Sequence, residues 1–390
     1  MILRDAQNKI KEMSEKFWVI ALLGPRQSGK TTLARYTFPE HVYVSLENLE
    51  TRSLAASDPK SFLAQFDGAK GVILDEIQHV PDLLSYMQTK VDLEKKPGFF
   101  VITGSQNLLL NQSITQTLAG RIFILRLLPL ALDELKKANL LPATIETLLF
   151  QGCYPSIYAY DISPQDWYAN YIQTYVERDV RQLKNIGDLS LFQLFVKLCA
   201  GRIGQLLNLT SLANDCGISV NTARSWISIL EASYIVFLLQ PHYKNFSKRL
   251  IKSPKLYFYD TGLASHLLGI ESAQDLVTHY LRGGLFESLI ISSLMKSSYN
   301  QGKNAHLYFW RDKSGNEIDC IIERGELLIP VEMKSGKTYS QSFFSSIEYF
   351  NEISQQPKHP SFVVYAGDEL ISLKAGELVG WRSLDRVVQD

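Results

Sequence analysis

Short apolar runs and amphipathic stretches alternate along the first third of the chain. A short continuous apolar run between polar or glycine-rich segments is typical of a strand buried on both faces. Four such runs are present, at residues 18–24, 71–76, 99–105 and 121–127. Helical periodicity lies between them, around residues 61–66 and 82–94. The pattern predicts an α/β fold with a doubly wound, mostly parallel sheet that binds its ligand at the carboxyl ends of the strands.

After residue 130 the pattern becomes helical, with periodic stretches at 132–141, 145–150 and 165–184. The segment that follows is more specific. Residues 210–216 fit a first helix and Gly217 fits a tight turn. Four apolar residues at helical spacing then fit the buried face of a second helix: Ala223, Trp226, Ile227 and Leu230. This spacing predicts a helix-turn-helix.

The second helix and a basic ribbon after it are candidates for DNA binding. Two predicted strands, 234–240 and 256–259, flank a stretch without acids that carries five basic residues: Lys244, Lys248, Arg249, Lys252 and Lys255. This combination predicts a winged helix with a basic wing. The residues assigned to DNA contact are Asn221, Thr222, Arg224, Lys248 and Arg249. Such modules also serve as protein–protein packing units, so both roles stay open.

Composition restricts the kinds of partner. The chain has 390 residues, and its 40 Lys and Arg balance 40 Asp and Glu, so the formal net charge is zero. A nucleic-acid surface is therefore a local patch rather than a property of the whole molecule. Hydrophobic residues at 46% exclude wholesale disorder. At roughly 100–200 residues per domain, the length predicts two to four domains.

The cysteines and the apolar runs point to a cellular compartment. The four cysteines are scattered and form no C-x-x-C pair, which disfavours a disulfide scaffold or a zinc site and indicates a reducing compartment. The first residues lack the apolar core of a signal peptide, and no apolar run approaches the roughly 20 residues that span a bilayer. We therefore expect a soluble, cytoplasmic protein without a membrane partner.

Residues 24–31, GPRQSGKT, match the G-x-x-x-x-G-K-[ST] pattern of a phosphate-binding loop. Gly24 and Gly29 let the backbone curl so that its N–H groups point at phosphate oxygens, and the following helix adds the positive end of its dipole. Lys30 reaches the β- and γ-phosphates in this prediction, and the Thr31 hydroxyl ligates Mg²⁺. The predicted nucleotide-binding residues are Gly24, Gln27, Ser28, Gly29, Lys30, Thr31 and Thr32.

Two adjacent carboxylates, Asp75 and Glu76, end the second predicted strand. Asp75 suits Mg²⁺ coordination there, and Glu76 can polarise a water for in-line attack on the γ-phosphate. The next apolar run ends in small polar residues, of which Ser105 is the first choice to sense the γ-phosphate and Thr103 a weaker one. Arg121 is either an arginine finger that acts across a subunit boundary in a homo-oligomer or a surface charge.

The C-terminal part of the chain contains a second group of acids. A predicted helix at 284–295 carries Glu287, one predicted strand carries Asp319, and the next carries Glu332 and Lys334. Residues i and i+2 of a strand project to the same face, so Glu332 and Lys334 point together and Asp319 can join them. The carboxylates can hold Mg²⁺, with Glu287 as a further ligand, while the lysine orients a water or stabilises phosphate charge. An exposed salt-bridged hairpin is the alternative.

These acids and the lysine resemble the restriction-endonuclease-like PD-(D/E)xK core. The chain as a whole is similar to a prokaryotic family of AAA-like ATPases that carry a C-terminal, nuclease-like domain of unknown function. The matching segments are GPRQSGKTTLAR (24–35), VILDEIQHVPDLL (72–84), ITGSQNLLL (102–110), TLAGRI (117–122), YVERDV (175–180), SPKLYFYDTGLASHLLG (253–269), RGGLFESLI (282–290) and residues 315–336. The resemblance implies ATP as the nucleotide and an ATPase core with an additional strand and a catalytic glutamate.

Together these features predict four domains: a P-loop AAA-like domain at 1–135, a helical lid or linker at 136–200, a winged helix at 201–259 and a nuclease-like domain at 260–390. Asp260 is expected to cap the helix after it. The predicted function is a Mg²⁺-dependent ATPase that binds DNA through the winged helix and couples nucleotide state to the nuclease-like domain. Two alternatives stay open: a nucleotide-controlled switch with an inactive docking domain, and a DNA-binding regulator.

Overall fold

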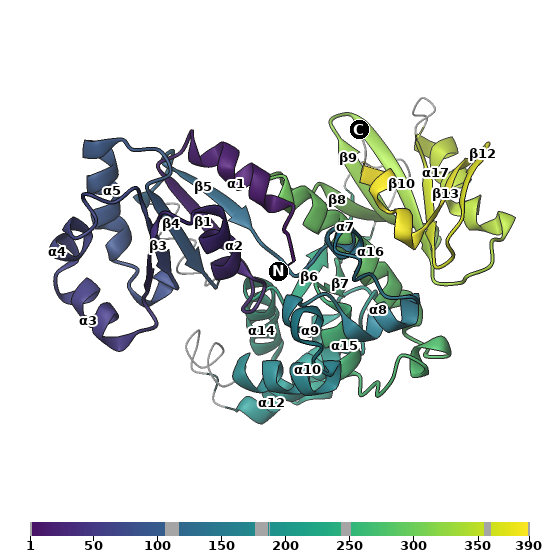
Figure 1. Cartoon of the computed structure of the whole chain (residues 1–390). Helices are drawn as coiled ribbons and strands as arrows, with labels where there is room; N and C mark the ends of the chain where they lie inside the picture. Colours follow the sequence, from purple (N-terminus) through teal and green to yellow (C-terminus); the bar gives the residue numbers. More distant parts are fainter. Residues whose placement is uncertain are drawn as a thin grey trace. The chain divides into compact units, whose positions relative to one another are not determined.

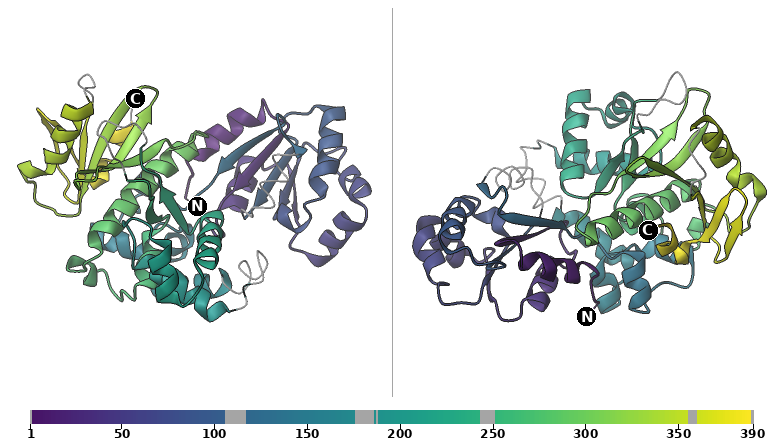
Figure 2. Two further views of the ribbon diagram at one scale, coloured as in Figure 1. Left: turned by 180° about the vertical axis from the view of Figure 1, so that it is seen from behind. Right: turned by 90° about the horizontal axis from the view of Figure 1, so that it is seen from above.

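The computed structural model describes residues 2–105, 117–175, 186, 188–242, 251–354 and 360–388. The chain divides into two compact units, which Figures 1 and 2 draw as ribbons coloured along the sequence. Unit 1 is Met1–Leu130 with Ala232–Tyr234 and Ser298–Lys303, and unit 2 is the remainder. The first segment of unit 1 ends at Leu130, and the boundary at residue 135 stays a prediction. The predicted boundaries at 200 and 259 fall inside unit 2, and the division there stays a prediction.

Unit 1 is built on a five-stranded parallel sheet with the order β2-β3-β4-β1-β5 (Figure 1). The strands are β1 (Val19–Leu23), β2 (Val42–Ser45), β3 (Val72–Asp75), β4 (Phe100–Gly104) and β5 (Ile122–Arg126). Strand β4 lies between β1, which precedes the phosphate loop, and β3, which ends in Asp75. This order confirms the predicted doubly wound sheet with an additional strand between the two nucleotide motifs.

Helices cover both faces of this sheet, as the continuous apolar runs of its strands require. Successive side chains of β1 point in opposite directions, so Val19, Ala21 and Leu23 join one core cluster and Ile20 and Leu22 join another. The first cluster includes residues of α3 (Leu49–Ser57), α4 (Pro59–Ala64) and α5 (Leu83–Glu94). The second includes residues of α1 (Ala6–Ser14) and α2 (Lys30–Thr37). The sheet is therefore the middle layer of three.

Unit 2 begins with helices: α7 (Leu132–Lys137), α8 (Ile145–Gln151), α9 (Pro155–Tyr160), α10 (Pro164–Thr174) and α12 (Leu189–Ala200). The helix expected at 132–141 is shorter than predicted, because Asn139 adopts a left-handed φ of 56° that ends the helical turn. The helix expected at 165–184 is described as far as Tyr175, and its remainder lies outside the described residues.

The predicted helix pair is present in unit 2 as α13 (Leu209–Cys216) and α14 (Val220–Ala232). Gly217 ends α13 with a left-handed φ of 71°, the turn that the sequence assigned to it. The apolar positions of α14 are buried as predicted: Ala223, Trp226, Ile227 and Leu230. An antiparallel ribbon follows, made of β6 (Val236–Leu239) and β7 (Lys255–Phe258).

Asp260 caps α15 (Thr261–Leu267), as expected, through a hydrogen bond of 2.9 Å from the Leu263 N–H. The buried carboxylate also accepts hydrogen bonds from the Cys153 N–H (2.7 Å) and the Tyr168 hydroxyl (2.5 Å). One buried side chain therefore joins α15 to two earlier segments of unit 2.

A six-stranded mixed sheet forms the C-terminal part of unit 2, with the order β12-β13-β11-β10-β9-β8. Its strands are β8 (Leu307–Arg311), β9 (Glu317–Arg324), β10 (Leu327–Lys334), β11 (Phe362–Tyr365), β12 (Leu370–Leu373) and β13 (Gly376–Gly380). Strands β8, β9 and β10 are antiparallel neighbours, and β11 is parallel to β10. Helix α16 (Arg282–Asn300) precedes the sheet, and α17 (Ser345–Ser354) packs on it.

The remaining short helices are η1 (Ile77–His79), η3 (Asp275–Val277), η4 (Gln341–Phe344), η5 (Trp381–Ser383) and α18 (Asp385–Val388). All four cysteines are buried free thiols. Within the described part of the chain, every helix is too short or too polar to cross a bilayer.

Candidate functional site

The loop between β1 and α2 has the shape that its glycines predict. Gly29 adopts a left-handed φ of 91° as the residue before α2, a conformation that side chains with a Cβ rarely take. At Gly24, a Cβ would lie 2.1 Å from the carbonyl oxygen of Leu127. Glycine is therefore required at both positions for different reasons, one conformational and one steric.

Lys30 points back into this loop. It is 4% exposed, and its ammonium donates hydrogen bonds to the carbonyl oxygens of Gly24 (3.0 Å) and Pro25 (2.7 Å). The Ser28 hydroxyl is fully buried and has no hydrogen-bond partner among the described residues. The Arg4 guanidinium holds the loop backbone through a bond of 2.6 Å to the Ser28 carbonyl. A buried ammonium and an unpartnered hydroxyl inside a glycine loop fit a phosphate group.

Asp75 is the centre of a hydroxyl network at the carboxyl edge of the sheet. Its carboxylate accepts hydrogen bonds from the Thr31 hydroxyl (2.8 and 3.1 Å), from the Tyr43 hydroxyl (2.8 Å) and from the Thr103 hydroxyl. Burial, and then the bond to Asp75, raise the pKa of Tyr43 to about 12. The structure thus brings together Thr31 and Asp75, the two residues predicted to hold Mg²⁺ at this site.

Glu76 adjoins this network in an unusual backbone conformation. Its φ of 58° is left-handed, which costs a non-glycine residue about 1–3 kcal/mol, and its N–H donates to the Thr103 hydroxyl (3.2 Å). The Gln78 amide donates both to the Glu76 carboxylate and to the Ser105 hydroxyl (3.0 Å). Burial alone would raise the pKa of Glu76, but Lys30, Gln78 and Arg26 outweigh it and lower this pKa.

The two candidates for a γ-phosphate sensor therefore have different partners. Thr103 is fully buried and contacts Asp75 and the Glu76 backbone, whereas Ser105 is only half-buried and reaches Glu76 through Gln78. Gln27 and Thr32, also predicted to bind nucleotide, are exposed in the loop and in the first turn of α2.

Arg121 lies at the opposite edge of the sheet from the phosphate loop. It precedes β5, whose first residue pairs with Val19, whereas the phosphate loop follows Leu23 at the other end of β1. The two edges are separated by about 13 Å of strand. Arg121 instead forms a bidentate ion pair with Asp92, with distances of 2.6 and 2.9 Å. Within one subunit it does not reach the nucleotide site.

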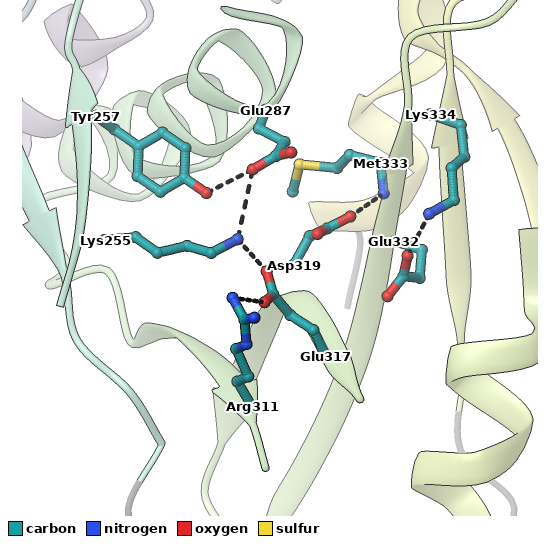
Figure 3. A network of polar contacts seen from close by, with 9 residues as sticks. All are labelled: Lys255, Tyr257, Glu287, Arg311, Glu317, Asp319, Glu332, Met333 and Lys334. Atoms are coloured by element: carbon teal, nitrogen blue, oxygen red, sulfur yellow. Dashed lines mark hydrogen bonds and ion pairs between the residues drawn. The ribbon is translucent and has the colours of Figure 1, made fainter. Parts of the chain in front are cut away.

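Figure 3 shows the second group of acids, which lies where β9 has an irregularity in its pairing with β8. Tyr308 pairs with Ile321 but Trp310 with Ile318, so β9 has one extra residue between these pairs. A bulge of this kind changes the direction of the side chains in it. Asp319 is one of the two residues in the bulge, and its carboxylate accepts a hydrogen bond of 2.9 Å from the Met333 N–H.

Glu332 and Lys334 project from the same face of β10, as predicted, and their side chains form an ion pair of 2.7 Å. Glu332 is 2% exposed, and its Oε1 has no hydrogen-bond partner among the described residues. Burial and then the neighbouring Asp319 carboxylate raise the pKa of Glu332 to about 8. A buried carboxylate oxygen without a donor, beside a second carboxylate, fits a divalent cation.

Glu287 of α16 has different partners from those expected. It accepts a hydrogen bond of 2.6 Å from the Tyr257 hydroxyl and lies 3.6 Å from the Lys255 ammonium (Figure 3). Burial and the Asp319 carboxylate raise its pKa to about 7. In the described ranges no group of three His, Cys, Asp or Glu side chains is gathered closely enough to form a metal site. The predicted trio of Glu287, Asp319 and Glu332 is therefore not assembled as one ligand set.

The structure describes only part of the predicted DNA-contacting face, and its role in DNA binding stays a prediction. Asn221 and Arg224 are exposed on α14, together with Ser228. Thr222 is half-buried, and its N–H donates to the Ser219 hydroxyl (3.0 Å) at the start of the helix. Lys248 and Arg249, like Lys244, lie outside the described residues. The assignment of Lys255 to a solvent-facing basic wing was wrong, because this lysine is 3% exposed and pairs with Glu287 and Glu317.

Comparison with known proteins places the chain in a family. An uncharacterized protein of Mycobacterium tuberculosis is 30% identical over 345 residues, which cover 87% of this chain and 75% of that protein. The chain belongs to the family of this mycobacterial protein. An uncharacterized protein of Mycobacterium bovis matches equally well, and one of Haemophilus influenzae is 22% identical over 278 residues, covering 67% of this chain and 64% of that protein.

Three family descriptions divide the chain. Residues 16–136 match a family described as AAA domain, 143–274 match a domain of unknown function (DUF8612), and 282–384 match another (DUF4143). The AAA match contains both nucleotide motifs, which supports a P-loop ATPase of AAA type. The two other matches are described as domains of unknown function, so they say nothing about chemistry.

Solved structures of low identity are also similar. A Walker-type ATPase of Pyrococcus abyssi is 16% identical, with a TM-score of 0.45 over 67% of this chain and 94% of that chain. RuvB of Thermotoga maritima is 19% identical, with a TM-score of 0.32 over 60% and 88%. AMPPCP-bound DnaA from Aquifex aeolicus is 13% identical, with a TM-score of 0.31 over 58% and 85%. All three scores are low, so the fold assignment rests on the sheet order and the family match.

Several residues of both sites were missed at the sequence level. Tyr43 lies on β2, a short and largely exposed edge strand whose apolar run, 42–44, is only three residues long. Gln78 follows the acidic pair within a 3₁₀ turn, and nothing in its spacing points to Glu76. Lys255 had no such signal either, because only the structure shows that it is the one charged residue in a strand whose four positions are all buried. A lysine in such a strand requires a carboxylate partner.

Proposed function

We propose that the chain is a Mg²⁺-dependent ATPase in which Lys30, Thr31, Asp75 and Glu76 carry the reaction. The observation that supports this most directly is the Asp75 carboxylate, which lies within hydrogen-bond distance of the Thr31 hydroxyl and next to Glu76 in sequence. Thr31 and Asp75 are the residues that would hold Mg²⁺. When bound, this ion would neutralise phosphate charge as the terminal phosphate leaves.

Lys30 and Glu76 have separate tasks in this proposal. Lys30 exchanges the carbonyl oxygens of Gly24 and Pro25 for phosphate oxygens, which are better partners because they carry full negative charge. Glu76 accepts a proton from the attacking water. The lowered pKa of Glu76 keeps it ionised, and therefore able to accept that proton, throughout the neutral range.

Titration calorimetry with ATP tests the binding half of this proposal. Replacing the Lys30 ammonium in Lys30→Ala should lower the affinity for ATP at least 100-fold, since a buried charged contact to phosphate is lost. Lys60→Ala is the matched control, because Lys60 is exposed at the start of α4. Equal ATP affinity in the wild type and Lys30→Ala would contradict the proposal.

We also propose that unit 2 binds DNA through α14 and its ribbon. The support is the shape of this segment, in which a helix pair joined at Gly217 precedes an antiparallel ribbon, and the exposed face that carries Asn221 and Arg224. Arg224→Ala should weaken duplex DNA binding and lower its salt dependence by about one phosphate contact. Lys374→Ala, a change of equal charge at another exposed position, should leave both unchanged. ATP turnover measured with and without DNA tests whether the two activities are coupled.

For the C-terminal sheet we propose a nuclease-like fold. The order α16, β8, β9, β10, α17 and β11, with Asp319 in a bulge opposite Glu332 and Lys334, supports this assignment. Asp319 and Glu332 are the residues that would hold a divalent ion, while Lys334 would lie beside the phosphate. Asp319→Ala and Lys334→Ala should abolish any Mg²⁺-dependent DNA cleavage without changing ATP hydrolysis.

The pairing of Glu287 with Lys255 and Tyr257 favours a second candidate function, in which this domain is an inactive docking module of a nucleotide-controlled switch. Supercoiled and linear DNA incubated with Mg²⁺ or Mn²⁺ separates the two candidates. Cleavage by the wild type but not by Glu332→Ala supports a nuclease. Intact DNA with both proteins supports the switch.

A further inference from the structure

One side chain in the acidic site of unit 2 comes from outside the sheet and its helices. Lys255 begins β7, yet its ammonium lies among the carboxylates in Figure 3. It pairs with Glu317 and lies 3.6 Å from Glu287, and it also lies 5.6 Å from the centre of the Phe309 ring. Its side chain is 4% exposed. A lysine this deeply buried remains charged only where carboxylates compensate it.

The backbone fixes this ammonium in place. The ribbon docks on β8, the edge strand of the six-stranded sheet, where the His242 N–H donates to the Phe309 carbonyl (2.7 Å) and the Phe309 N–H donates to the Gln240 carbonyl (3.1 Å). The Gly204 N–H, which comes before α13, also donates to the Leu256 carbonyl (2.8 Å). Lys255 therefore enters the acidic site from a strand that is held on more than one side.

The charges of the site fall into two groups. On one side, Glu287 and Glu317 are compensated by Lys255 and Arg311, and Glu287 also accepts the Tyr257 hydrogen bond. On the other side, Glu332 pairs with the Lys334 ammonium and one of its oxygens has no donor, while Asp319 lies between the two groups and is attracted by both Lys334 and Lys255. Four carboxylates therefore face three cations, and the carboxylate oxygen without a donor lies on the second side.

We propose that the Lys255 ammonium is a built-in cation of this site, and that it takes the place of a metal ion beside Glu287. The site then accepts one divalent ion, between Asp319 and Glu332, and Glu287 is not a ligand of that ion. This inference rests on the divalent-ion site proposed above. It goes beyond that site because it states that Lys255, a residue of the ribbon, determines how many ions bind.

Mn²⁺ binding to nucleotide-free protein tests the inference, with free Mn²⁺ measured by electron paramagnetic resonance. All proteins carry Thr31→Ala, so that the phosphate loop contributes no ion. The parent should bind one Mn²⁺, which is lost in Glu332→Gln. Lys255→Met should bind a second ion, because Glu287 then lacks its cation and Glu317 keeps only Arg311. Lys255→Arg, which keeps the charge, should bind one ion like the parent.

The double variant Lys255→Met with Glu287→Gln separates charge from packing. This variant lacks both the Lys255 ammonium and the Glu287 carboxylate that the ammonium compensates, so it should again bind one ion. Two ions in the parent, or one ion in Lys255→Met, would overturn the inference. A parent that binds no ion would contradict the proposed metal site instead. In that case, gain of an ion by Lys255→Met would still support the built-in cation, and no gain would overturn it.

Lys255→Met leaves the buried Glu287 carboxylate without its cation, a change that also lowers the stability of the folded state. Thermal unfolding with and without Mn²⁺ covers this case. Because an ion that binds only the folded state raises the melting temperature, Mn²⁺ should raise that of Lys255→Met more than that of the parent or of Lys255→Arg. Equal shifts in all three proteins would overturn the inference.

Discussion

The Tyr43 hydroxyl donates a hydrogen bond of 2.8 Å to Oδ2 of Asp75, and it does so from β2, the strand at the edge of the sheet. Asp75 thus receives hydroxyl groups from three different elements, since Thr31 lies on α2 and Thr103 on β4. The carboxylate that the proposal assigns to Mg²⁺ is oriented before any ion arrives.

Removing this hydroxyl should weaken the Mg²⁺ site without removing it. A hydrogen bond of this kind contributes about 0.5–1.5 kcal/mol, so Tyr43→Phe should lower ATP turnover about 2–10-fold at limiting Mg²⁺. ATP affinity without Mg²⁺ should not change. The measurement is turnover as a function of Mg²⁺ concentration, with Tyr36→Phe, at an exposed position of α2, as the control. An unchanged Mg²⁺ dependence would show that Tyr43 does not position Asp75.

Gln78 donates hydrogen bonds to both Ser105 and Glu76, so Ser105 should influence Glu76 only through Gln78. Gln78→Met and Ser105→Ala should each lower kcat several-fold with little change in ATP affinity. The double variant should be no slower than the worse single variant, because residues in one hydrogen-bond chain are not additive. Gln65→Met, at an exposed position, is the control. Losses that multiply in the double variant would mean that the two residues act independently.

Arg121 should have little effect on turnover. Its position at the amino edge of the sheet and its ion pair with Asp92 favour the surface-charge alternative that the sequence left open. Arg121→Ala should change ATP turnover by less than about twofold at all protein concentrations. Arg121 does not reach the nucleotide site, and its exposed ion pair contributes little to stability. A large loss that appears only at concentrations where subunits associate would identify an arginine finger.

Asp260 should be far more important for stability than an exposed capping residue. It caps α15 and also accepts hydrogen bonds from the Cys153 N–H and the Tyr168 hydroxyl, all of them buried. Asp260→Ala should cost about 3–5 kcal/mol of unfolding free energy, because buried donors lose their acceptor. Asp188→Ala, at the exposed cap of α12, should cost about 1 kcal/mol. Urea unfolding followed by circular dichroism measures both, and equal costs would contradict the buried network.

The raised pKa of Glu332 makes stability depend on pH in a defined direction. The folded protein holds this proton up to about pH 8, whereas the unfolded chain releases it near the ordinary pKa of glutamate. The folded state therefore binds more protons between these values, so the unfolding free energy should fall from pH 5 to pH 8 in the presence of a chelator. Glu332→Gln should lose less stability over this range. A steeper loss in the variant would contradict the assignment.

The fold of unit 1 could be predicted because each of its inner strands is a continuous apolar run. β1, β3, β4 and the edge strand β5 were all expected from such runs, whereas β2 was not, since its run of apolar residues, 42–44, is only three residues long. Strand β12 was missed because it is a largely exposed edge strand. Strand β13 was missed although it lies inside the sheet and its last three residues are buried.

The candidate sites were predictable where local spacing sets the geometry. The Thr31–Asp75 contact follows from two motifs at one sheet edge, and the Glu332–Lys334 pair follows from strand alternation. The contacts of Tyr43, Gln78 and Lys255 depend on which distant segments pack together, and no spacing in the sequence reports that. The bulge at Asp319 is also invisible in the sequence, because it depends on pairing with β8.

The most direct test of the central claim compares Glu76→Gln with the wild type, measuring bound ATP and released phosphate in the same Mg²⁺-containing sample. Glu50→Gln, exposed at the start of α3, is the control. We predict that Glu76→Gln binds ATP as tightly as the wild type and releases phosphate at least about 100 times more slowly, because the group that accepts the water proton is gone. Phosphate release at the wild-type rate by Glu76→Gln, or no ATP bound by the wild type, would contradict the claim.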